Sequence, residues 1–214
     1  MDAEFWHKKW EEKDIAFHTC DANPLLVRYF DTLALAPGAG VFLPLCGKTR
    51  DIAWLSQRGM RVIGVELSAI AVEELFAELG VVPEVSRSGE LRYYRGGGIE
   101  IYQGDVFALA PSQLATVEAV YDRAALVALP AEMRRRYSAH VVQLSSAAPQ
   151  LLINYDYDQR AMPGPPFAIS DAELQGHYAK HYQLEALYCE AVDGGLKGLC
   201  PALEKVWRLQ PRGV

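Results

Sequence analysis

Apolar and polar positions along this chain follow two different periods, which predicts an alternation of strands and helices. Continuous apolar runs at 41–45 and 61–66 predict buried strands, because a strand covered on both faces is apolar throughout. The apolar positions between Ser68 and Gly80 instead recur with helical spacing. Ser68 is a favourable N-cap residue and Gly80 a favourable helix stop, so both ends of this helix are encoded locally.

The same reasoning extends over the rest of the chain. We expect helices over 3–13, from Asn23-Pro24 to Pro37-Gly38, over 50–58 and 68–79, from Pro130 to about Ser146, and from Ser170 to about Ala179. We expect further strands over 91–95, 99–103, 117–122, 151–155, 182–190 and 204–209. This alternation predicts an α/β fold with a doubly wound, mostly parallel sheet and a closing pair of strands. One domain over 1–214 is expected, with an N-terminal helical cap over 1–35.

Charge and composition narrow the class of protein. The 214 residues include 21 basic and 27 acidic side chains and carry a net charge of −6, which argues against a nucleic-acid-binding protein. The first 14 residues are highly charged, and no apolar run is long enough for a membrane span, so we expect a cytoplasmic protein without a membrane partner. The four cysteines lack metal-ligand spacing, and we expect reduced thiols and no metal site.

The turn after the first strand can be tested against two phosphate-binding motifs. A Walker A loop needs glycine five residues before Gly47-Lys48-Thr49, but Phe42 stands there. A Rossmann fingerprint needs three glycines in and after the turn, and here Gly47 stands alone beside the bulky pair Leu45-Cys46. Close approach of a pyrophosphate is therefore disfavoured. A nucleoside without phosphates fits better, and S-adenosylmethionine is the commonest such cofactor.

Residues at the carboxyl ends of the predicted strands are the candidate binding residues, because ligands of open α/β sheets bind at that edge. They are Leu45 to Gly47, Glu66, Asp105 and Asp122-Arg123. Glu66 lies 21 residues after Leu45, where a carboxylate accepts hydrogen bonds from the two ribose hydroxyls in nucleotide-binding folds. The alternative for Glu66 is a solvated strand end.

The other candidates also have structural alternatives. Asp105 suits an adenine amino group, or a turn after Gly104. Arg123 suits a cofactor carboxylate or the acceptor, or an ion pair with Asp122 or another acid. Trp10 and its aromatic neighbours suit a lid over the site, although composition alone favours an amphipathic helix packed on the core.

Six segments are distinctive when taken together: Phe5-Trp6-His7-Lys8-Lys9-Trp10, Ala16-Phe17-His18, Pro44-Leu45-Cys46-Gly47-Lys48, Gly64-Val65-Glu66-Leu67-Ser68, Tyr121-Asp122-Arg123-Ala124-Ala125-Leu126-Val127-Ala128, and Pro163-Gly164-Pro165-Pro166-Phe167. Through them the chain resembles the thiopurine S-methyltransferase family, especially its bacterial members, nearly from end to end. The resemblance implies a seven-stranded class I methyltransferase fold, which is Rossmann-like. It also implies methyl transfer from S-adenosylmethionine to the sulfur of aromatic or heterocyclic thiols, including thiopurines.

The resemblance also implies site residues. It places cofactor contacts at Trp10, Leu45, Glu66 and Arg123, with Gly47 and Asp105 as further candidates, and a substrate contact at Phe17. The stretch 193–200 departs from the family's arginine-bearing pattern on the substrate side, and Lys197 is the candidate replacement.

The expected reaction is an in-line displacement in which an acceptor thiolate attacks the sulfonium methyl group. Heterocyclic thiols ionise readily, so no dedicated base is required, and Arg123 is the candidate stabiliser of the anionic acceptor. Three alternatives remain: detoxifying methylation of selenium or tellurium species or small thiols, a nicotinamide-dependent oxidoreductase, and a non-catalytic sensor of an adenosyl ligand. We expect a monomer.

Overall fold

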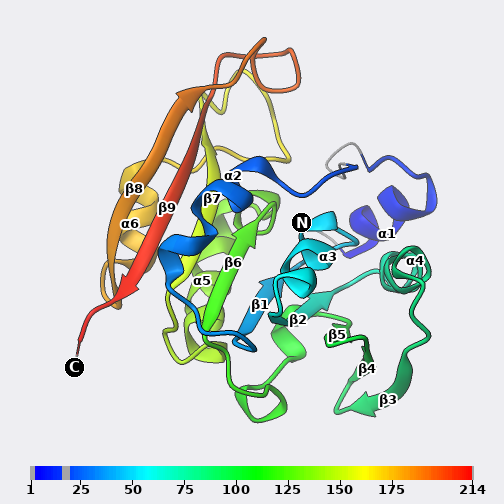
Figure 1. Ribbon diagram of the computed structural model, residues 1–214. Helices are drawn as coiled ribbons and strands as arrows, with labels where there is room; N and C mark the ends of the chain where they lie inside the picture. Colours follow the sequence, from blue (N-terminus) through cyan, green and yellow to red (C-terminus); the bar gives the residue numbers. More distant parts are fainter. Residues whose placement is uncertain (1–2, 16–19, 214) are drawn as a thin grey trace.

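A single nine-stranded sheet with helices against it forms the frame of the protein (Figure 1). The computed structural model describes residues 3–15 and 20–213. Its helices are α1 (Ala3–Glu11), α2 (Pro24–Tyr29), η1 (Phe30–Leu33), α3 (Arg50–Gln57), α4 (Ala69–Leu79), η2 (Val106–Ala108), η3 (Pro111–Gln113), η4 (Leu126–Ala128), α5 (Ala131–Leu144) and α6 (Asp171–Tyr178). Its strands are β1 (Gly40–Pro44), β2 (Arg61–Glu66), β3 (Glu84–Ser88), β4 (Leu91–Gly96), β5 (Ile99–Gln103), β6 (Ala119–Arg123), β7 (Gln150–Asp156), β8 (Tyr182–Ala191) and β9 (Leu203–Pro211).

The strand order is β3-β4-β5-β2-β1-β6-β7-β9-β8. The five central strands from β5 to β7 are parallel, whereas β3 and β4 at one edge and β9 and β8 at the other pair antiparallel. The predicted α/β fold is therefore confirmed. The row from β5 to β8 contains the seven strands that the resemblance implied, and the β3-β4 pair extends it to nine.

All eight segments predicted as strands form strands, and β3 is the one that the sequence analysis did not anticipate. Its residues are exposed except for the half-buried Ser88, and Val85 is its one large apolar side chain. An edge strand with both faces in water needs no apolar alternation, so periodicity cannot reveal it.

Each face of the sheet is covered by its own apolar core. Leu26 of α2, Ile52 of α3 and Val72 of α4 belong to one core, and Tyr137 of α5 and Leu174 of α6 belong to the other. Neighbouring strand residues alternate between the two cores, as β geometry requires. Helices on both faces make this a doubly wound sheet.

The end caps predicted for two helices are present. The Ser68 hydroxyl accepts the backbone N–H of Ala71, and Gly80 ends α4 in the left-handed conformation. The Ser170 side chain likewise accepts the N–H of Glu173 at the start of α6. Among the described helices, none combines the length and apolar character needed to cross a membrane.

Candidate active site

The turn between β1 and α3 has an unusual backbone. Leu45 and Gly47 both have positive φ, +48° and +53°, and Leu45 pays the steric cost that glycine avoids. Ala124, directly after β6, is a second non-glycine residue with positive φ, at +59°. Because β1 and β6 are adjacent, these strained residues meet at one edge of the sheet. Such strain persists where the surroundings enforce it, and functional sites are the common case.

Glu66 ends β2 beside this turn and is buried, with 6% of its surface exposed. One carboxylate oxygen accepts the N–H of Gly47 at 2.8 Å and the other accepts the N–H of Ser68 at 2.7 Å. Burial raises the pKa of the carboxyl group, and the N–H donors of Ser68 and Gly47 act in the opposite direction. Glu66 is therefore a positioned carboxylate and not the solvated strand end that the sequence also allowed.

Two residues of the turn have structural partners. The Lys48 ammonium pairs with Glu74 at 2.7 Å and Glu78 at 2.6 Å on α4, which agrees with the rejection of a Walker loop. The Cys46 thiol is buried against Gly64 of β2, where an added Cβ would lie 2.7 Å from its sulfur. Burial raises the pKa of Cys46 well above its usual range, and Cys46 is a packed thiol, not a nucleophile.

Trp10 packs against the same turn. It is 4% exposed and is the one buried residue of the described part of α1. A Cβ added at Gly47 would lie 3.1 Å from ring carbon Cζ2 of Trp10, so the indole covers the glycine directly. Helix α1 thus lies near the carboxyl edge of the sheet beside α4 (Figure 1).

Arg123, the last residue of β6, faces the α3 side of the sheet. Its Nη1 lies 3.9 Å from Oδ2 of Asp51, and its side chain is 17% exposed. The Asp51 carboxylate also accepts the Tyr121 hydroxyl at 3.1 Å and the backbone N–H of Asn23 at 2.7 Å. The acid that pairs with Arg123 is therefore Asp51 and not Asp122. Sequence analysis missed Asp51, although its place in the first helical turn after the predicted site could have indicated it.

Asp122 points to the opposite face of the sheet. Its carboxylate accepts the N–H of Leu126 at 3.0 Å and the hydroxyl of Tyr137 at 2.7 Å. Burial raises the pKa of Asp122 to about 6, while those two donors act to lower it. Of the strand-end pair, only Arg123 lies beside the Leu45 turn, and Asp122 holds the segment after β6 in place.

Asp105 lies in the loop after β5 and is exposed. Its carboxylate accepts the N–H of Phe107 at 3.0 Å and caps η2, as the turn alternative predicted. The preceding residue, Gly104, donates its N–H to the Glu66 carbonyl at 2.8 Å. Asp105 therefore follows directly on a residue bonded to the Glu66 backbone.

Lys197 belongs to the connection between β8 and β9. Its ammonium donates to the Pro165 carbonyl at 2.8 Å, which joins this connection to the proline-rich loop. The pKa of Asp14 is lowered chiefly by its bond with Lys9 and, to a smaller degree, by the charge of Lys197. Phe17, the predicted substrate contact, lies outside the described residues.

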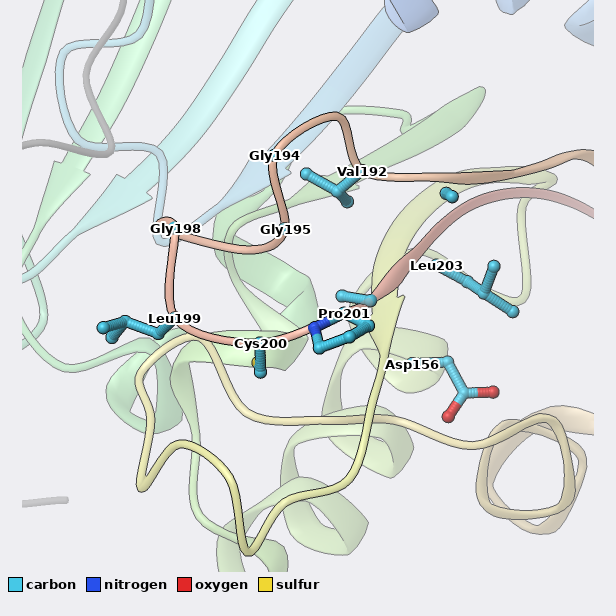
Figure 2. Close-up of a pocket in the computed structure, with 11 residues that line it drawn as sticks. Asp156, Val192, Gly194, Gly195, Gly198, Leu199, Cys200, Pro201 and Leu203 are labelled. Atoms are coloured by element: carbon cyan, nitrogen blue, oxygen red, sulfur yellow. The ribbon is translucent and has the colours of Figure 1, made fainter.

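A hollow of about 540 Å³ opens in the β8–β9 connection (Figure 2). It is lined by Asp156 and by ten residues in and beside that connection, Ala191, Val192, Gly194, Gly195, Gly198, Leu199, Cys200, Pro201, Ala202 and Leu203. Figure 2 shows Cys200 and Pro201 beneath the glycine-rich stretch. The described candidates Trp10, Glu66 and Arg123 are not part of its wall. The described residues also bring together no cluster of three or more His, Cys, Asp or Glu side chains suited to a metal ion.

Comparison with known proteins decides the family. The family model described as thiopurine S-methyltransferase (TPMT) matches residues 1–209. The chain is 54% identical over 211 residues to the thiopurine S-methyltransferase of Xanthobacter autotrophicus, covering 98% of this chain and 99% of that protein. The chain belongs to the thiopurine S-methyltransferase family. It is also 45% identical to the thiopurine S-methyltransferase of Gluconobacter oxydans, with 98% and 96% coverage.

Solved structures give the fold of this family member independently. A TehB-like S-adenosylmethionine-dependent methyltransferase from Corynebacterium glutamicum superimposes with a TM-score of 0.58 at 14% identity, covering 98% of both chains. The 1,6-didemethyltoxoflavin-N1-methyltransferase of Burkholderia thailandensis, solved with bound 1,6-didemethyltoxoflavin and S-adenosylhomocysteine, superimposes with a TM-score of 0.63 at 15% identity, covering 97% of this chain and 87% of that one. At these identities the likeness shows the class I methyltransferase fold alone.

Membership of the thiopurine S-methyltransferase family makes the protein an S-adenosylmethionine-dependent methyltransferase, as the sequence analysis predicted. The nicotinamide-dependent oxidoreductase and the non-catalytic sensor are thereby set aside. The residues that bind the methyl donor and the identity of the acceptor are matters for proposal.

Proposed function

We propose that this enzyme transfers the methyl group of S-adenosylmethionine to the sulfur of aromatic or heterocyclic thiols, including thiopurines. The observation that carries the proposal is the arrangement around Gly47. Its N–H bonds the Glu66 carboxylate, the Trp10 ring covers it, and strained Leu45 precedes it by two residues. The relatives at 45% and 54% identity bear the name of this activity, which supports the choice of acceptor.

The residues at the carboxyl edge fit an adenosyl ligand. Each Glu66 oxygen accepts one backbone N–H and has a second lone pair, so the carboxylate can also accept ribose hydroxyls. In the proposal the backbone of Leu45 and Gly47 borders the ligand, Trp10 covers it, and Asp105 accepts from the adenine amino group. Arg123 then binds the carboxylate of the methyl donor or the anionic acceptor, because a guanidinium is suited to carboxylates and other anions.

When bound, S-adenosylmethionine supplies a sulfonium-activated methyl group that a thiolate can displace in line. The chain's own residues then have to align the acceptor, exclude water and stabilise the negative charge of the acceptor thiolate. Alignment of this kind can contribute roughly 7–11 kcal/mol to lowering a barrier. Trp10 excludes water from the turn, and Arg123 stabilises the thiolate directly or through a water molecule. The proposal assigns no general base, since the acceptor ionises by itself and Cys46 is held as a thiol.

Phe17 and Lys197 are proposed to contact the acceptor from the N-terminal segment and from the β8–β9 connection. The bond from the Lys197 ammonium to the Pro165 carbonyl, which places this side chain at the proline-rich loop, supports this role for Lys197. The action of the enzyme as a monomer on a small molecule, in the cytoplasm, stays a prediction that gel filtration and cell fractionation can check.

Calorimetric titration tests the binding part of the proposal. We expect S-adenosylhomocysteine to bind and reduced nicotinamide dinucleotide not to bind. Glu66→Ala should weaken S-adenosylhomocysteine by more than about 1.4 kcal/mol, a tenfold change. Glu100→Ala is the matched control. Glu100 lies near the start of β5 and pairs with Arg61 at the start of β2, whereas Glu66 lies at the end of β2. An unchanged affinity in Glu66→Ala would return Glu66 to a purely structural role.

A panel of acceptors with labelled methyl donor tests the choice of substrate. We expect aromatic and heterocyclic thiols to be methylated faster than small alkyl thiols, selenide or tellurite. Preference for the selenium or tellurium species would move the function to chalcogen detoxification. Arg123→Ala should lower the rate for an anionic thiol at saturating methyl donor, and an unchanged rate would refute its role toward the acceptor.

A further inference from the structure

A buried carboxylate beside the candidate site joins three separate segments of the chain. Asp51 is 0% exposed and lies in the first turn of α3. Its Oδ1 accepts the backbone N–H of Asn23 at 2.7 Å. Its Oδ2 accepts the Tyr121 hydroxyl at 3.1 Å and lies 3.9 Å from Nη1 of Arg123. Burying a carboxylate without partners costs free energy. Here a backbone N–H, a hydroxyl and a guanidinium together stabilise its negative charge.

The partners of Asp51 lie in different parts of the fold, and their positions indicate what the carboxylate connects. Arg123 ends β6 at the carboxyl edge, where the methyl donor and acceptor are proposed to bind. Asn23 caps α2 through bonds to the N–H groups of Leu25 and Leu26, and it follows the segment that leads from Trp10. Asp51 therefore links the start of α2 to the guanidinium.

We propose that Asp51 is a positioning residue for methyl transfer, which holds the Arg123 guanidinium in place and couples it to the start of α2. This inference rests on the proposed function, which gives Arg123 its contact with the methyl donor or the thiolate. An arginine side chain has several rotatable bonds, and fixing it before the reactants bind avoids an entropic cost at that moment. Asp51 acts through Arg123 and does not touch the reactants.

A second role for Asp51 makes the opposite prediction. If the carboxylate only neutralised part of the arginine charge, then Asp51→Asn would leave Arg123 more attractive to an anion and would raise kcat/KM. Under the positioning role, Asp51→Asn lowers kcat/KM for an anionic thiol by at least tenfold. Tyr121→Phe loosens Asp51 without removing its charge, and it should lower kcat/KM by about threefold.

A double-mutant cycle distinguishes positioning from general destabilisation. In an Arg123→Ala background, Asp51→Asn should change kcat/KM by less than threefold, because the residue that it positions is gone. An equal loss in both backgrounds, or a gain in the single variant, would overturn the proposal. Tyr121→Phe repeats the test should Asp51→Asn fail to fold, and thermal midpoints of all variants are measured alongside.

Asp122→Asn is the matched control. Asp122 is an equally buried carboxylate on the neighbouring residue of β6, but its partners, Leu126 and Tyr137, lie on the opposite face. Its effect on kcat/KM should be the same with and without Arg123. The single variant Arg123→Ala tests the proposed function by itself. If that variant keeps full activity, the proposed role of Arg123 fails; if it loses activity while the cycle is additive, only the Asp51 inference fails.

Discussion

At the scale of single residues, the neighbours Asp122 and Arg123 show how strand alternation separates chemistry from support. Sequence analysis nominated both because they end the same predicted strand. In the structure Arg123 meets Asp51 on one face, and Asp122 meets Leu126 and Tyr137 on the other. Consecutive side chains of a strand point to opposite faces of the sheet, so two neighbouring residues do not contact the same ligand merely because both end the strand. A carboxylate that was nominated as a strand-end binding residue is therefore a buried anchor for the backbone after β6.

Asp122 makes the stability of the protein depend on pH in a direction that can be measured. Burial raises its pKa from 3.8 to about 6, so the folded protein holds this proton more tightly than the unfolded chain does. Its contribution to stability is therefore largest below pH 4 and is lost as the pH rises through 6. The change amounts to about 3 kcal/mol at most.

Asp122→Asn cannot titrate and should lose this dependence. Urea denaturation of both proteins at pH 4.5 and pH 7.5 measures it. We expect the wild type to lose stability relative to the variant between the two pH values. Parallel behaviour of the two proteins would mean that the carboxyl pKa is not raised in the folded state.

At the scale of elements, the turn after β1 depends on the strand beside it. β2 passes next to the turn with Gly64, and the Cys46 thiol occupies the space that a side chain there would take. Two residues further along β2, the Glu66 carboxylate accepts the backbone N–H of Gly47 in the same turn. Gly64 makes room for Cys46, and Glu66 bonds the backbone of Gly47. Two residues of β2 thus shape the turn after β1, which contains a single glycine.

Gly64→Ala should disturb this pairing. Its new Cβ would lie 2.7 Å from Cys46 Sγ and 2.7 Å from Ile101 Cδ1. Overpacking of this kind costs about 1–3 kcal/mol in the free energy of unfolding, measured by urea denaturation. Adding Cys46→Ala should recover part of the loss, because the Cys46 Cβ lies at an ordinary 3.6 Å.

Gly176→Ala provides the control for a glycine in open space. Gly176 lies within α6 and an added Cβ meets nothing within 4 Å, so we expect a gain of about 0.5–1 kcal/mol from helix propensity. If Gly64→Ala were as well tolerated as Gly176→Ala, the close packing of Cys46 on β2 would be refuted.

At the scale of the whole molecule, residues from the N-terminal part of the chain pack against the two C-terminal strands. The Arg208 side chain of β9 donates to the Thr32 carbonyl at 3.2 Å, and the rings of Tyr29 and Tyr188 lie 6.2 Å apart. α2 and η1 therefore lie against the C-terminal strands, and Trp10 of α1 packs on the turn after β1. This arrangement suits a segment that closes over a ligand at the carboxyl edge, which is the role predicted for residues 1–35.

Trp10→Ala tests the closing role. We expect the affinity for S-adenosylhomocysteine, measured by calorimetry, to fall more than tenfold, because the indole covers Gly47 beside Glu66. The sheet should stay folded, since Trp10 is the one buried side chain of the described part of α1. Phe5→Ala removes another aromatic ring from the same helix and should leave the affinity within about twofold. Equal losses in both variants would point to a general loosening of α1.

The sequence by itself determined the order and type of most elements, because apolar periodicity, end caps and turn residues act over a few neighbouring positions. It also located Leu45, Glu66 and Arg123 at strand ends, since the edge that binds ligands follows from the predicted parallel order. It did not reveal β3, whose side chains are solvated and carry no periodic pattern.

Only the tertiary structure decided which of these residues act together. The pairing of Asp51 with Arg123 joins positions 72 residues apart, and the bond from Gly47 to Glu66 joins two strands through a turn. The structure also turned Asp122 away from the crevice and gave Lys48 its partners on α4. Contacts between distant segments depend on how strands are ordered in the sheet and which face each side chain takes. Local patterns specify the elements but not these meetings.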